Sequence, residues 1–574
     1  MKKYIKYIKN NWKATILAPL LMMLDAIGSI VQPLLASKII DIGIANGDTN
    51  YIIKMGIIMI ACSLVVMICG FGCMYFSSKA AYGFAYNLRE DMITKIQDFS
   101  FSNINKFKTS SLVTRLTNDV TVISNLFQMI LRIVVRAPFM FIGGIIMALF
   151  LSKRLTLLLA VMIPLLTILV IFILKKTAPL FNKVQSSIDK VNAVIRESLK
   201  GIRVIKTFVR EDYQKEKFEK ANANLQKVSI NSFGKIIVLG PLISLIMNTA
   251  VAAVLWFGAK EALNGHIEVG ELTSFIIYIM MVLSSLIMMS MVFMNFARAK
   301  ASSDRILEVI NEEPDIKSEN GIKEKIKVEK ITFNINSFTF KEASSPSLKN
   351  IKFEVNKGDR VAIIGSTGSG KSTLVNLIPR FYDVEDGEIL INETNIKNFD
   401  LKTLRDLIGM VLQENRLFKG TIKENILWGK KDATNEELKH ALSVAQIDDY
   451  VETLEDKYNA VVEQRGSNFS GGQKQRLCIA RALIKKPQIL ILDDSVSALD
   501  ATTEANLTNA LNKEFKKMIV FTVTQRISSC KNADYVIVME NGTITDMGTH
   551  EELLKTSKVY KEINNSQQEV LLDA

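Results

Sequence analysis

The chain is poor in residues that build disulfides and metal centres. It has five cysteines among 574 residues, and none stands at the spacing of a metal-ligating motif. Cys62, Cys69 and Cys73 share one apolar stretch at roughly helical spacing, which favours packing between helices over redox chemistry. The sequence therefore predicts a reduced, cytoplasm-facing protein without a cysteine-based metal site.

A nucleic-acid-binding motif is also lacking, although the formal net charge is +13. Lysines and arginines cluster at the ends of long apolar runs, as the positive-inside rule requires of a membrane protein. We therefore expect no nucleic-acid partner, and we expect the positive charge to face a lipid bilayer.

Long apolar runs are present, but only in about the first 300 residues, and the remainder alternates short β-branched runs with amphipathic segments. A helix needs about 20 apolar residues to cross the hydrocarbon core of a bilayer. Six stretches meet this requirement: 14–40, 52–76, 133–151, 155–174, 236–257 and 272–296. The sequence predicts an α-helical six-span membrane domain followed by a soluble α/β domain.

The connections between these spans differ in length and charge. Three are short and are assigned to the outside: 41–50, 152–154 and 264–270. The two long, charged connections at 79–132 and 175–235 are assigned to the inside, which makes both termini cytoplasmic. Their helical pattern predicts helices that continue beyond the membrane, each turning once, near 100–111 and near 204–214. We expect these turns to touch the soluble domain.

The N-terminal segment is basic and amphipathic, which is typical of a helix lying on the membrane surface. The apolar stretch after it is too long for a signal-peptide core, so we expect no cleavage. The expected organisation is an interfacial helix at 1–12, a transmembrane domain at 13–305, a linker at 306–325 and a soluble domain at 326–574.

Three charged residues fall within or beside the predicted spans. Asp25 lies mid-span in the first, where a charge is costly unless it faces a cavity or a partner. It is either part of a substrate path or a polar contact between helices, or else a protonated packing residue. Arg132 and Arg136 begin the third span, and we expect them to extend toward the inner interface.

The sixth span is rich in methionine: Met280, Met281, Met288, Met289, Met291 and Met294. Flexible thioether side chains suit a surface that accommodates varied apolar ligands. At these spacings the methionines cover the whole helix circumference, so several must face lipid or neighbouring helices. A role in lining a ligand path is left open for a subset of them.

The soluble part contains a complete phosphate-binding loop in the required strand–loop–helix context. A buried-strand pattern at 361–364 precedes it, and an apolar helix follows. The loop runs Gly365, Ser366, Thr367, Gly368, Ser369, Gly370, Lys371, Ser372 and Thr373. Its glycines let backbone N–H groups surround phosphate oxygens at a helix N-terminus. Lys371 is expected to reach the β- and γ-phosphates of ATP, and Ser372 to ligate Mg²⁺.

Two further motifs complete the pattern. Asp493 closes the apolar strand at 489–492 and is expected to hold Mg²⁺ through water, the Walker-B role. Between it and the loop lies a segment that contains Ser470, Gly471, Gly472 and Gln473. This combination resembles the signature sequence of ATP-binding cassette (ABC) transporters. The resemblance covers essentially the whole chain and implies the half-transporter layout of type IV ABC exporters, six spans followed by a P-loop nucleotide-binding domain.

The resemblance implies roles for other residues. Gln413 matches the Q-loop, which contacts Mg²⁺ and senses the γ-phosphate. The segment 497–500 matches the D-loop, which ends here in Asp500 and crosses to the opposite subunit. The aromatic residue that stacks on adenine is assigned to Phe340, with Phe338 as the alternative; stacking does not need the hydroxyl of the usual tyrosine.

Two residues depart from the family pattern. Asp494 stands where the family has a glutamate that polarises the attacking water, and Gln525 stands where it has a histidine that contacts the γ-phosphate. A carboxylate one methylene shorter retreats by more than about 1 Å, and misplacement on that scale costs on the order of 10²-fold in rate. Gln525 can donate a hydrogen bond, but it can neither become cationic nor shuttle a proton.

In this family each ATP is held between the P-loop of one subunit and the signature of the other. The chain therefore resembles the degenerate-site subunit of heterodimeric bacterial multidrug exporters, with a weakened site on its own P-loop and an intact signature for its partner. The resemblance implies ATP and Mg²⁺ as cofactors, a second half-transporter as partner, and export of an amphipathic small molecule, such as a drug, across the cell membrane by an ATP-hydrolysing complex.

Two alternatives stay open at the level of sequence. The chain could form a homodimeric exporter of lipid or peptide that hydrolyses ATP slowly with Asp494 as base. It could also be a non-catalytic regulatory cassette subunit, in which ATP binding only sets a conformation. No peptidase domain precedes the first span, so we do not expect a leader-cleaving peptide exporter.

Overall fold

The computed structural model describes the chain except residues 1–3, 318–320, 342, 496–498, 515, 573 and 574. It divides into two compact units. The membrane unit comprises residues 1–97 and 110–311, and the nucleotide-binding unit comprises residues 98–109 and 312–574. The chain thus passes between the units three times. The limits expected for the interfacial helix and the linker stay predictions.

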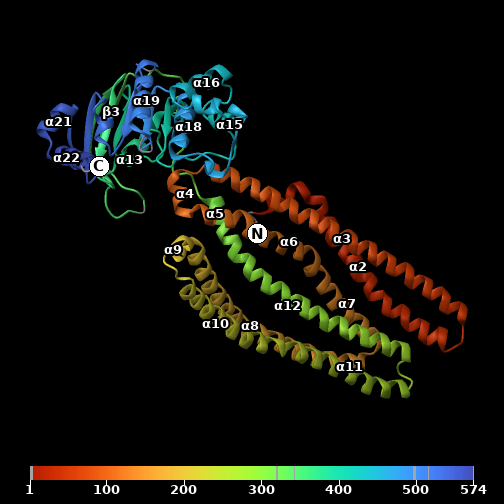
Figure 1. Cartoon of the computed structure of the whole chain (residues 1–574). Helices are drawn as coiled ribbons and strands as arrows, with labels where there is room; N and C mark the ends of the chain where they lie inside the picture. Colours follow the sequence, from red (N-terminus) through yellow and green to blue (C-terminus); the bar gives the residue numbers. More distant parts are fainter. Residues whose placement is uncertain (1–3, 318–320, 342, 496–498, 515, 573–574) are drawn as a thin grey trace. The chain divides into compact units, whose positions relative to one another are not determined.

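The membrane unit is entirely helical in its described residues (Figure 1). Its elements are α1 (Ile5–Ile8), η2 (Lys9–Asn11), α2 (Trp12–Lys38), η3 (Ile39–Ile44), α3 (Thr49–Gln97), α5 (Thr109–Thr114), η4 (Arg115–Asp119), α6 (Val120–Met129), η5 (Ile130–Val134), α7 (Val135–Leu151), α8 (Lys153–Lys200), α9 (Ile202–Thr207), α10 (Glu211–Ile237), α11 (Leu239–Leu263) and α12 (Val269–Asn311). Six described helical segments are long and apolar enough to cross a membrane. The predicted six-span organisation is confirmed.

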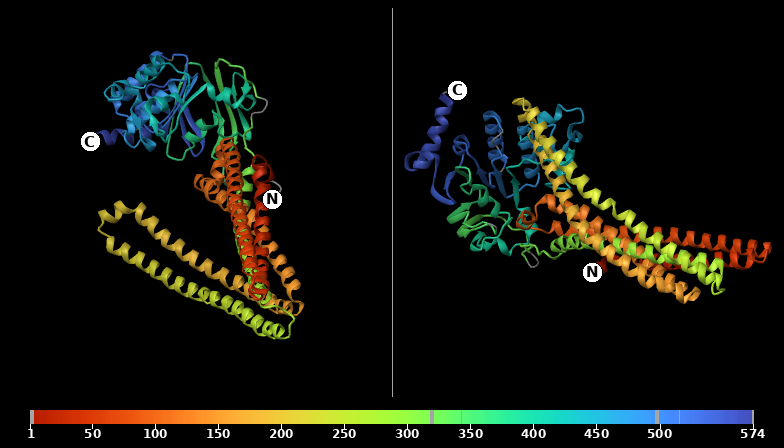
Figure 2. Two further views of the ribbon diagram at one scale, coloured as in Figure 1. Left: turned by 90° about the vertical axis from the view of Figure 1, so that its right-hand side faces the viewer. Right: turned by 90° about the horizontal axis from the view of Figure 1, so that it is seen from below.

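Helices α8 and α10 form a long antiparallel pair joined by the short helix α9. Both views in Figure 2 show this pair diverging from the group formed by α2, α3, α7 and α12. The tip at α9 stands apart from the other helices of the membrane unit. It carries exposed apolar side chains, including Val204, Phe208 and Val209. A tip of this kind leaves apolar surface uncovered in the single chain.

The turn at this tip begins earlier than the sequence predicts. Helix α8 ends at Lys200, and Gly201 follows as its C-cap, so the turn starts before the expected residues 204–214. Glycine has no Cβ and is the usual residue at a helix end. The other predicted turn, near 100–111, coincides with a break in the helix after Gln97 and with the short helix α4 (Phe101–Phe107).

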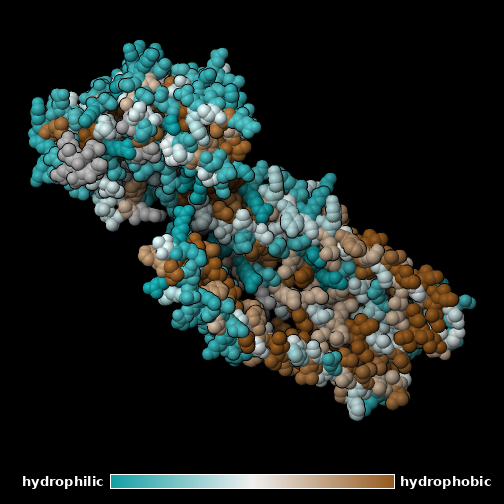
Figure 3. Space-filling view, in the orientation of Figure 1, coloured by the Kyte–Doolittle hydropathy of each residue, from teal (hydrophilic) through white to brown (hydrophobic). Residues whose placement is uncertain are grey.

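The surface of the membrane unit is apolar over most of its helices. Figure 3 shows hydrophobic residues gathered over the far ends of α2, α3 and α11. Large apolar side chains are exposed on several of the long helices: Ile57, Phe71, Phe150, Leu157 and Trp256. Water would not tolerate so much continuous apolar surface, whereas hydrocarbon does. The surface therefore matches a multi-pass membrane protein.

The nucleotide-binding unit contains three sheets. A four-stranded antiparallel sheet has the order β2-β1-β4-β5, a six-stranded sheet has the order β12-β11-β3-β10-β9-β6, and β7 pairs with β8. The strands are β1 (Lys330–Phe338), β2 (Leu348–Asn356), β3 (Arg360–Gly365), β4 (Asp386–Ile391), β5 (Thr394–Asn395), β6 (Ile408–Val411), β7 (Gly420–Thr421), β8 (Val461–Val462), β9 (Ile489–Asp493), β10 (Ile519–Val523), β11 (Tyr535–Glu540) and β12 (Thr543–Gly548). Strands β11, β3, β10, β9 and β6 are parallel neighbours.

Helices cover these sheets and form a separate helical part. They are α13 (Lys371–Leu377), η6 (Ile396–Asn398), α14 (Leu401–Asp406), α15 (Ile422–Leu427), α16 (Asn435–Val444), α17 (Asp448–Glu452), η7 (Lys457–Asn459), η8 (Gln464–Gly466), α18 (Gly471–Leu483), α19 (Ala501–Glu514), α20 (Ile527–Cys530), α21 (His550–Thr556) and α22 (Lys558–Leu572). Strand β9 is buried along its whole length, as expected of a central parallel strand with both faces covered. This unit is the predicted α/β domain.

Helix α4 packs with the nucleotide-binding unit although its sequence lies between two membrane-unit helices. The ring of Phe101 contacts the ring of Phe381 at a centroid distance of 4.5 Å. A side-chain hydrogen bond also joins Asn105 to Tyr382. Aromatic contact and a hydrogen bond together fix both ends of this short helix on the unit.

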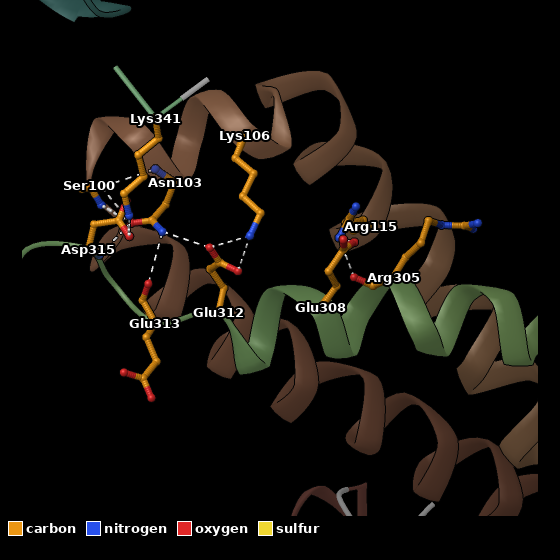
Figure 4. Close-up of polar contacts among 10 residues, drawn as sticks. All are labelled: Ser100, Asn103, Lys106, Arg115, Arg305, Glu308, Glu312, Glu313, Asp315 and Lys341. Atoms are coloured by element: carbon orange, nitrogen blue, oxygen red, sulfur yellow. Dashed lines mark hydrogen bonds and ion pairs between the residues drawn. The ribbon is translucent and has the colours of Figure 1, made fainter. Parts of the chain in front are cut away.

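Asn103 is the polar centre of this attachment (Figure 4). It is 1% exposed, and its Oδ1 accepts hydrogen bonds from Ser100 and from the backbone N–H of Asp315. Its Nδ2 donates to Glu312 Oε1 at 3.2 Å and to the backbone oxygen of Glu313 at 3.1 Å. One buried amide thereby ties α4 to the segment that follows α12.

A second polar cluster holds the membrane unit together near the end of α12 (Figure 4). Arg115 on η4 forms an ion pair with Glu308 at 2.7 Å. The fully buried Asp119 accepts hydrogen bonds from Ser302 and Arg305. Because a buried carboxylate is costly unless it is paired, this contact fixes η4 against α12.

We predict that Asn103→Ala loosens α4 while leaving the rest of the nucleotide-binding unit folded. The change leaves two acceptors and three donors without the Asn103 amide as partner, which costs roughly 1–3 kcal/mol. Hydrogen exchange of residues 98–109 in the full-length chain should rise. Lys323→Ala, an exposed change in the same connecting segment, serves as the control. Unchanged exchange in Asn103→Ala would contradict the role of this amide.

Candidate functional site

Four parallel strands of the six-stranded sheet end at one edge, and a predicted site residue follows each of them. In the register, Val523 at the end of β10 lies between Ile363 of β3 and Asp493 of β9. On the other side of β9, Val411 at the end of β6 pairs with Leu492. The P-loop, Gln413, Asp494 and Gln525 all follow within a few residues of these ends. The carboxyl edge of an open α/β sheet is where ligands bind.

The P-loop turns tightly between β3 and α13. Gly370 has φ +98° and is the N-cap of α13, a left-handed conformation that side chains with a Cβ rarely adopt. At Gly365 a Cβ would lie 2.1 Å from the backbone oxygen of Met539. These two glycines therefore permit the loop to close over the N-terminus of α13, where N–H groups point at a bound anion.

Lys371 is held inside this loop. Its Nζ donates to the backbone oxygens of Gly365 at 2.9 Å and Ser366 at 2.7 Å, and the residue is only 7% exposed. Burial lowers the pKa of Lys371, and the carboxylates of Asp494 and Asp493 oppose that shift. Carbonyl groups neutralise an ammonium less well than phosphate oxygens do, so this lysine is suited to an anionic ligand.

Ser372 and Asp493 are in direct contact. The Ser372 hydroxyl donates to Asp493 Oδ1 at 2.8 Å, and Asp493 is 3% exposed at the end of β9. Burial raises the pKa of Asp493; the hydrogen bond from Ser372 opposes the rise, whereas the nearby charge of Asp494 adds to it. Two oxygen donors thus lie together at the P-loop, the type of ligand that Mg²⁺ prefers.

Asp494 has a constrained backbone. Its φ is +49°, and its N–H donates to the backbone oxygen of Val523 at 3.0 Å. Aspartate tolerates this left-handed region better than most residues with a side chain. Because the hydrogen bond to β10 fixes the backbone, a short side chain at this position cannot be compensated by moving the chain forward.

Gln525 and Gln413 are both exposed at the same edge. The backbone oxygen of Gln525 accepts a hydrogen bond from Gln567 of α22 at 2.6 Å, which fixes the loop after β10 while its side chain faces outward. Gln413 follows β6 and the exposed Leu412. Both amides are accessible to a ligand bound at the P-loop edge.

The two candidate stacking residues differ in exposure. Phe338 is the last residue of β1 and is buried, with 4% of its surface exposed. Phe340 lies beyond the strand, is half-buried, and contacts the rings of Phe338 and Tyr382 edge-on, each at a centroid distance of 5.0 Å. The more accessible ring favours Phe340 as the residue that stacks on adenine.

A cavity of about 430 Å³ lies over the P-loop. Its lining residues are Pro346, Ser347, Gly368, Gly370, Lys371, Ser372, Thr373, Asn541 and Gly542. Sequence reasoning did not include Asn541 and Gly542, which form the hairpin turn between β11 and β12 with φ +48° and +81°. An Asn-Gly pair between two strands predicts such a turn, but its place beside the P-loop follows only from the order of the sheet.

The signature residues lie at the N-terminus of α18 and are not among those that line this cavity. Ser470 and Gln473 form a capping box: the hydroxyl accepts from the Gln473 N–H at 3.3 Å, and Gln473 Oε1 accepts from the Ser470 N–H at 2.8 Å. Ser470 and Gly471 are exposed. The segment is therefore a pre-formed helix N-terminus that is available to a ligand outside the chain's own P-loop cavity.

Asp500 caps α19. Its side chain accepts hydrogen bonds from the N–H and the hydroxyl of Thr503, at 3.0 and 2.7 Å. The hydrogen bond from the Thr503 backbone lowers the pKa of Asp500, and that from the Thr503 hydroxyl adds to the effect. The preceding D-loop residues, Ser497 and Ala498, lie outside the described part of the chain.

The residues present fit Mg·ATP. Glycines that allow close approach, a buried ammonium held by neutral carbonyls, and the adjoining oxygens of Ser372 and Asp493 match the phosphate chain and its ion. Phe340 offers a ring for the base. Together these groups supply one side of a binding site for a nucleoside triphosphate.

Comparison with known proteins agrees with this arrangement. Residues 15–286 match the family model described as the ABC transporter transmembrane region, and residues 348–497 match that described as ABC transporter. The uncharacterized ABC transporter ATP-binding protein YfiB of Bacillus subtilis is 39% identical over 99% of this chain and 98% of its own. A counterpart in Mycobacterium tuberculosis, Rv1273c, is 37% identical over 96% and 95%.

A solved structure supports the fold. The structure of a bacterial Atm1-family ABC exporter with ATP bound superimposes with a TM-score of 0.79, covering 98% of both chains at 23% identity. Fold and site together define a nucleotide-binding P-loop domain fused to a six-span membrane domain. The chain belongs to the ABC transporters and has the type IV exporter fold, as the sequence predicts. Membership implies nucleotide binding and ATP-driven transport across a membrane.

We predict that Lys371→Ala weakens nucleotide binding by the full-length chain by about tenfold or more, because it removes a charge-assisted contact to phosphate. A fluorescent ATP analogue titrated into the purified protein measures the affinity. Lys357→Ala, which breaks a surface ion pair with Glu329, is the matched control and should bind normally. Equal affinity in both variants would exclude the assigned role of Lys371.

Proposed function

We propose that the chain is the degenerate-site half of a heterodimeric ABC exporter that moves amphipathic substrates out of a bacterial cell. Its own P-loop would retain Mg·ATP with little turnover, while its signature would complete a hydrolytic site on the partner subunit. The separation of the signature from the chain's own P-loop cavity is the observation that carries this proposal.

A site divided in this way needs a second subunit. The cavity over the P-loop is lined by candidate phosphate and Mg²⁺ ligands, and none of its lining residues comes from the signature segment. The N-terminus of α18, with its exposed Ser470 and Gly471, offers such donors to another molecule. A single chain therefore holds two half-sites, and dimerisation would complete both.

Exposed apolar surface on each unit also supports assembly. The tip around α9 carries Val204, Phe208 and Val209, which are uncovered in the single chain. On the nucleotide-binding unit, Phe418 and Trp428 stack at a centroid distance of 4.5 Å and are both exposed. We propose that the partner subunit's nucleotide-binding unit covers the α9 tip and that its tip covers the aromatic pair.

Two substitutions support assigning the weak site to this chain. Asp494 follows Asp493 directly and is too short for the glutamate's role, and its backbone is fixed to Val523. Gln525 lies at the end of the adjacent strand and cannot carry a positive charge. Both residues belong to the edge that carries this chain's P-loop, so the defect would fall on this chain's own ATP and not on its partner's.

The sixth span supports an amphipathic substrate such as a drug. Among the methionines of α12, the described side chains of Met280, Met281 and Met289 are half-buried, and those of Met288 and Met291 are exposed. None of these five is packed into the core, so flexible thioethers are available to ligand or lipid. We propose that the half-buried ones line the substrate path.

We predict that two substitutions in this chain have unequal effects on the complex with its partner. Gly471→Asp puts a carboxylate where the partner-bound γ-phosphate would lie, so ATP turnover should fall nearly to background. Lys371→Ala affects only the weak site and should leave a substantial fraction of turnover. Similar losses in both variants would indicate two equivalent sites and favour a homodimer. Brisk turnover by the chain alone would do the same.

We predict that Asp494→Glu together with Gln525→His restores hydrolysis at this chain's own site. The test uses the complex that carries Gly471→Asp, because its background is low. Turnover should rise by on the order of 10-fold to 100-fold, because the longer side chain would return the carboxylate by about 1 Å to the position that the family's glutamate occupies. Adding Lys371→Ala should abolish the gain. A flat response would place the defect elsewhere, and absence of nucleotide-dependent efflux from the paired complex would favour a regulatory cassette.

A further inference from the structure

Three charged side chains gather inside the membrane unit. Asp25 lies in the middle of α2, Arg132 in η5 and Arg136 at the start of α7. All three are close enough to the thiol of Cys73, on α3, to interact with it electrostatically. Ionisable groups at such positions are costly and usually functional.

Asp25 and Arg136 form an ion pair between helices. The Nη2 of Arg136 lies 3.4 Å from Asp25 Oδ2, so Arg136 reaches across to α2. The Asp25 side chain is 6% exposed, whereas that of Arg136 is 37% exposed. The carboxylate is therefore enclosed by the bundle, and the guanidinium is the accessible member of the pair.

The pairing leaves polar atoms unsatisfied. Asp25 Oδ2 and Arg136 Nε are both buried, and neither makes a hydrogen bond within the described structure. A guanidinium has five N–H donors, and the single contact to Asp25 uses few of them. A buried polar group without a partner in a native structure indicates a missing ion, water or ligand.

Arg132 adds a second cation one turn before Arg136. It lies in η5, a π-helical turn, and such turns are frequent at functional sites. Among the described residues no carboxylate contacts Arg132, and Asp25 is the only one that contacts Arg136. The cluster therefore contains two guanidinium groups and one carboxylate.

Two partly exposed guanidinium groups and one buried carboxylate leave a net positive charge, which an anion would balance. Guanidinium groups bind phosphate and carboxylate oxygens in pairs of parallel hydrogen bonds. Asp25 holds Arg136 in place, and the exposed donors of Arg132 and Arg136 remain for an external group.

We propose that Arg132 and Arg136, positioned by Asp25, bind the anionic head group of an amphiphile. An apolar ring lies beside Arg136 on the helix surface, because Phe139 is three residues further along α7 and is exposed. An acyl chain can therefore lie along the helices while its phosphate or carboxylate meets the guanidinium pair. The amphiphile is either a resident anionic lipid or a transported acidic amphiphile; only the second case rests on the proposed export function.

Lipid retention tests the site without ATP. The full-length chain is purified in dodecyl maltoside with equimolar phosphatidylglycerol and phosphatidylcholine of identical acyl chains, and bound lipid is counted by native mass spectrometry. Wild type should retain phosphatidylglycerol preferentially. Arg136→Gln and Arg132→Gln should each reduce that retention by about tenfold, as expected for one charge-assisted contact. Phosphatidylcholine retention should not change.

Controls separate this site from general loss of charge or fold. Arg154→Gln removes an equal charge from an exposed pair with Glu261 and should retain lipid as wild type does. Asp25→Asn keeps an oxygen acceptor beside Arg136 but removes the charge that positions it, so retention of phosphatidylglycerol should fall by less than in Arg136→Gln. Equal lipid ratios in wild type, Arg132→Gln and Arg136→Gln would overturn the proposal. So would a loss in Asp25→Asn as large as in Arg136→Gln.

The source of the anion is distinguished with dodecyl phosphate. Displacement of the retained lipid, together with stimulated ATP turnover of the paired complex that is lost in Arg136→Gln, identifies a transported amphiphile. Retained phosphatidylglycerol that resists displacement identifies a resident lipid. Either result supports the anion site, and neither depends on whether the chain's own ATP site is degenerate.

Discussion

The hydrogen bond from Ser372 to Asp493 connects the two halves of the phosphate-binding edge. It joins the N-terminus of α13, which follows β3, to the end of β9, with β10 lying between these two strands. The register of the parallel strands fixes where the residues after β10 and β9 begin. Asp494 and Gln525 therefore lie at the same edge as the Ser372–Asp493 contact.

The sequence was sufficient to predict those parts of the structure that depend on residues close together in the chain. The six spans follow from apolar length alone, and the P-loop follows from glycines, a lysine and a serine between a buried strand and a helix. The expectation that Gln413, Asp493 and Gln525 meet one ligand requires only that their strands be parallel neighbours. Alternation of buried runs with helices predicts that arrangement before the register is known.

The sequence was insufficient to predict contacts between segments that are far apart in the chain. The attachment of α4 depends on Asn103 and on Glu312, which are 209 positions apart. Likewise, nothing local to Arg136 indicates that it pairs with Asp25, because that contact depends on how α2 packs on α7. Which of Phe338 and Phe340 is the more exposed ring depends on where β1 ends, and strand ends are harder to locate than strand centres.

The groups that would bind Mg·ATP and those that would act on water lie at different parts of the same edge, which makes the proposed division of function physically possible. The groups that would hold Mg·ATP come from the P-loop and from the end of β9, where Ser372 and Asp493 support each other. The groups that would act on water come from the next residue and from the loop after β10. Asp494 has a positive φ and donates a backbone hydrogen bond to Val523, and neither feature depends on the length of its side chain. A chain can thus lose the hydrolytic groups without disturbing the contacts that fold the site. On our proposal, the partner's site then sets the rate of ATP hydrolysis, while ATP bound at this chain's site sets the conformation of the complex.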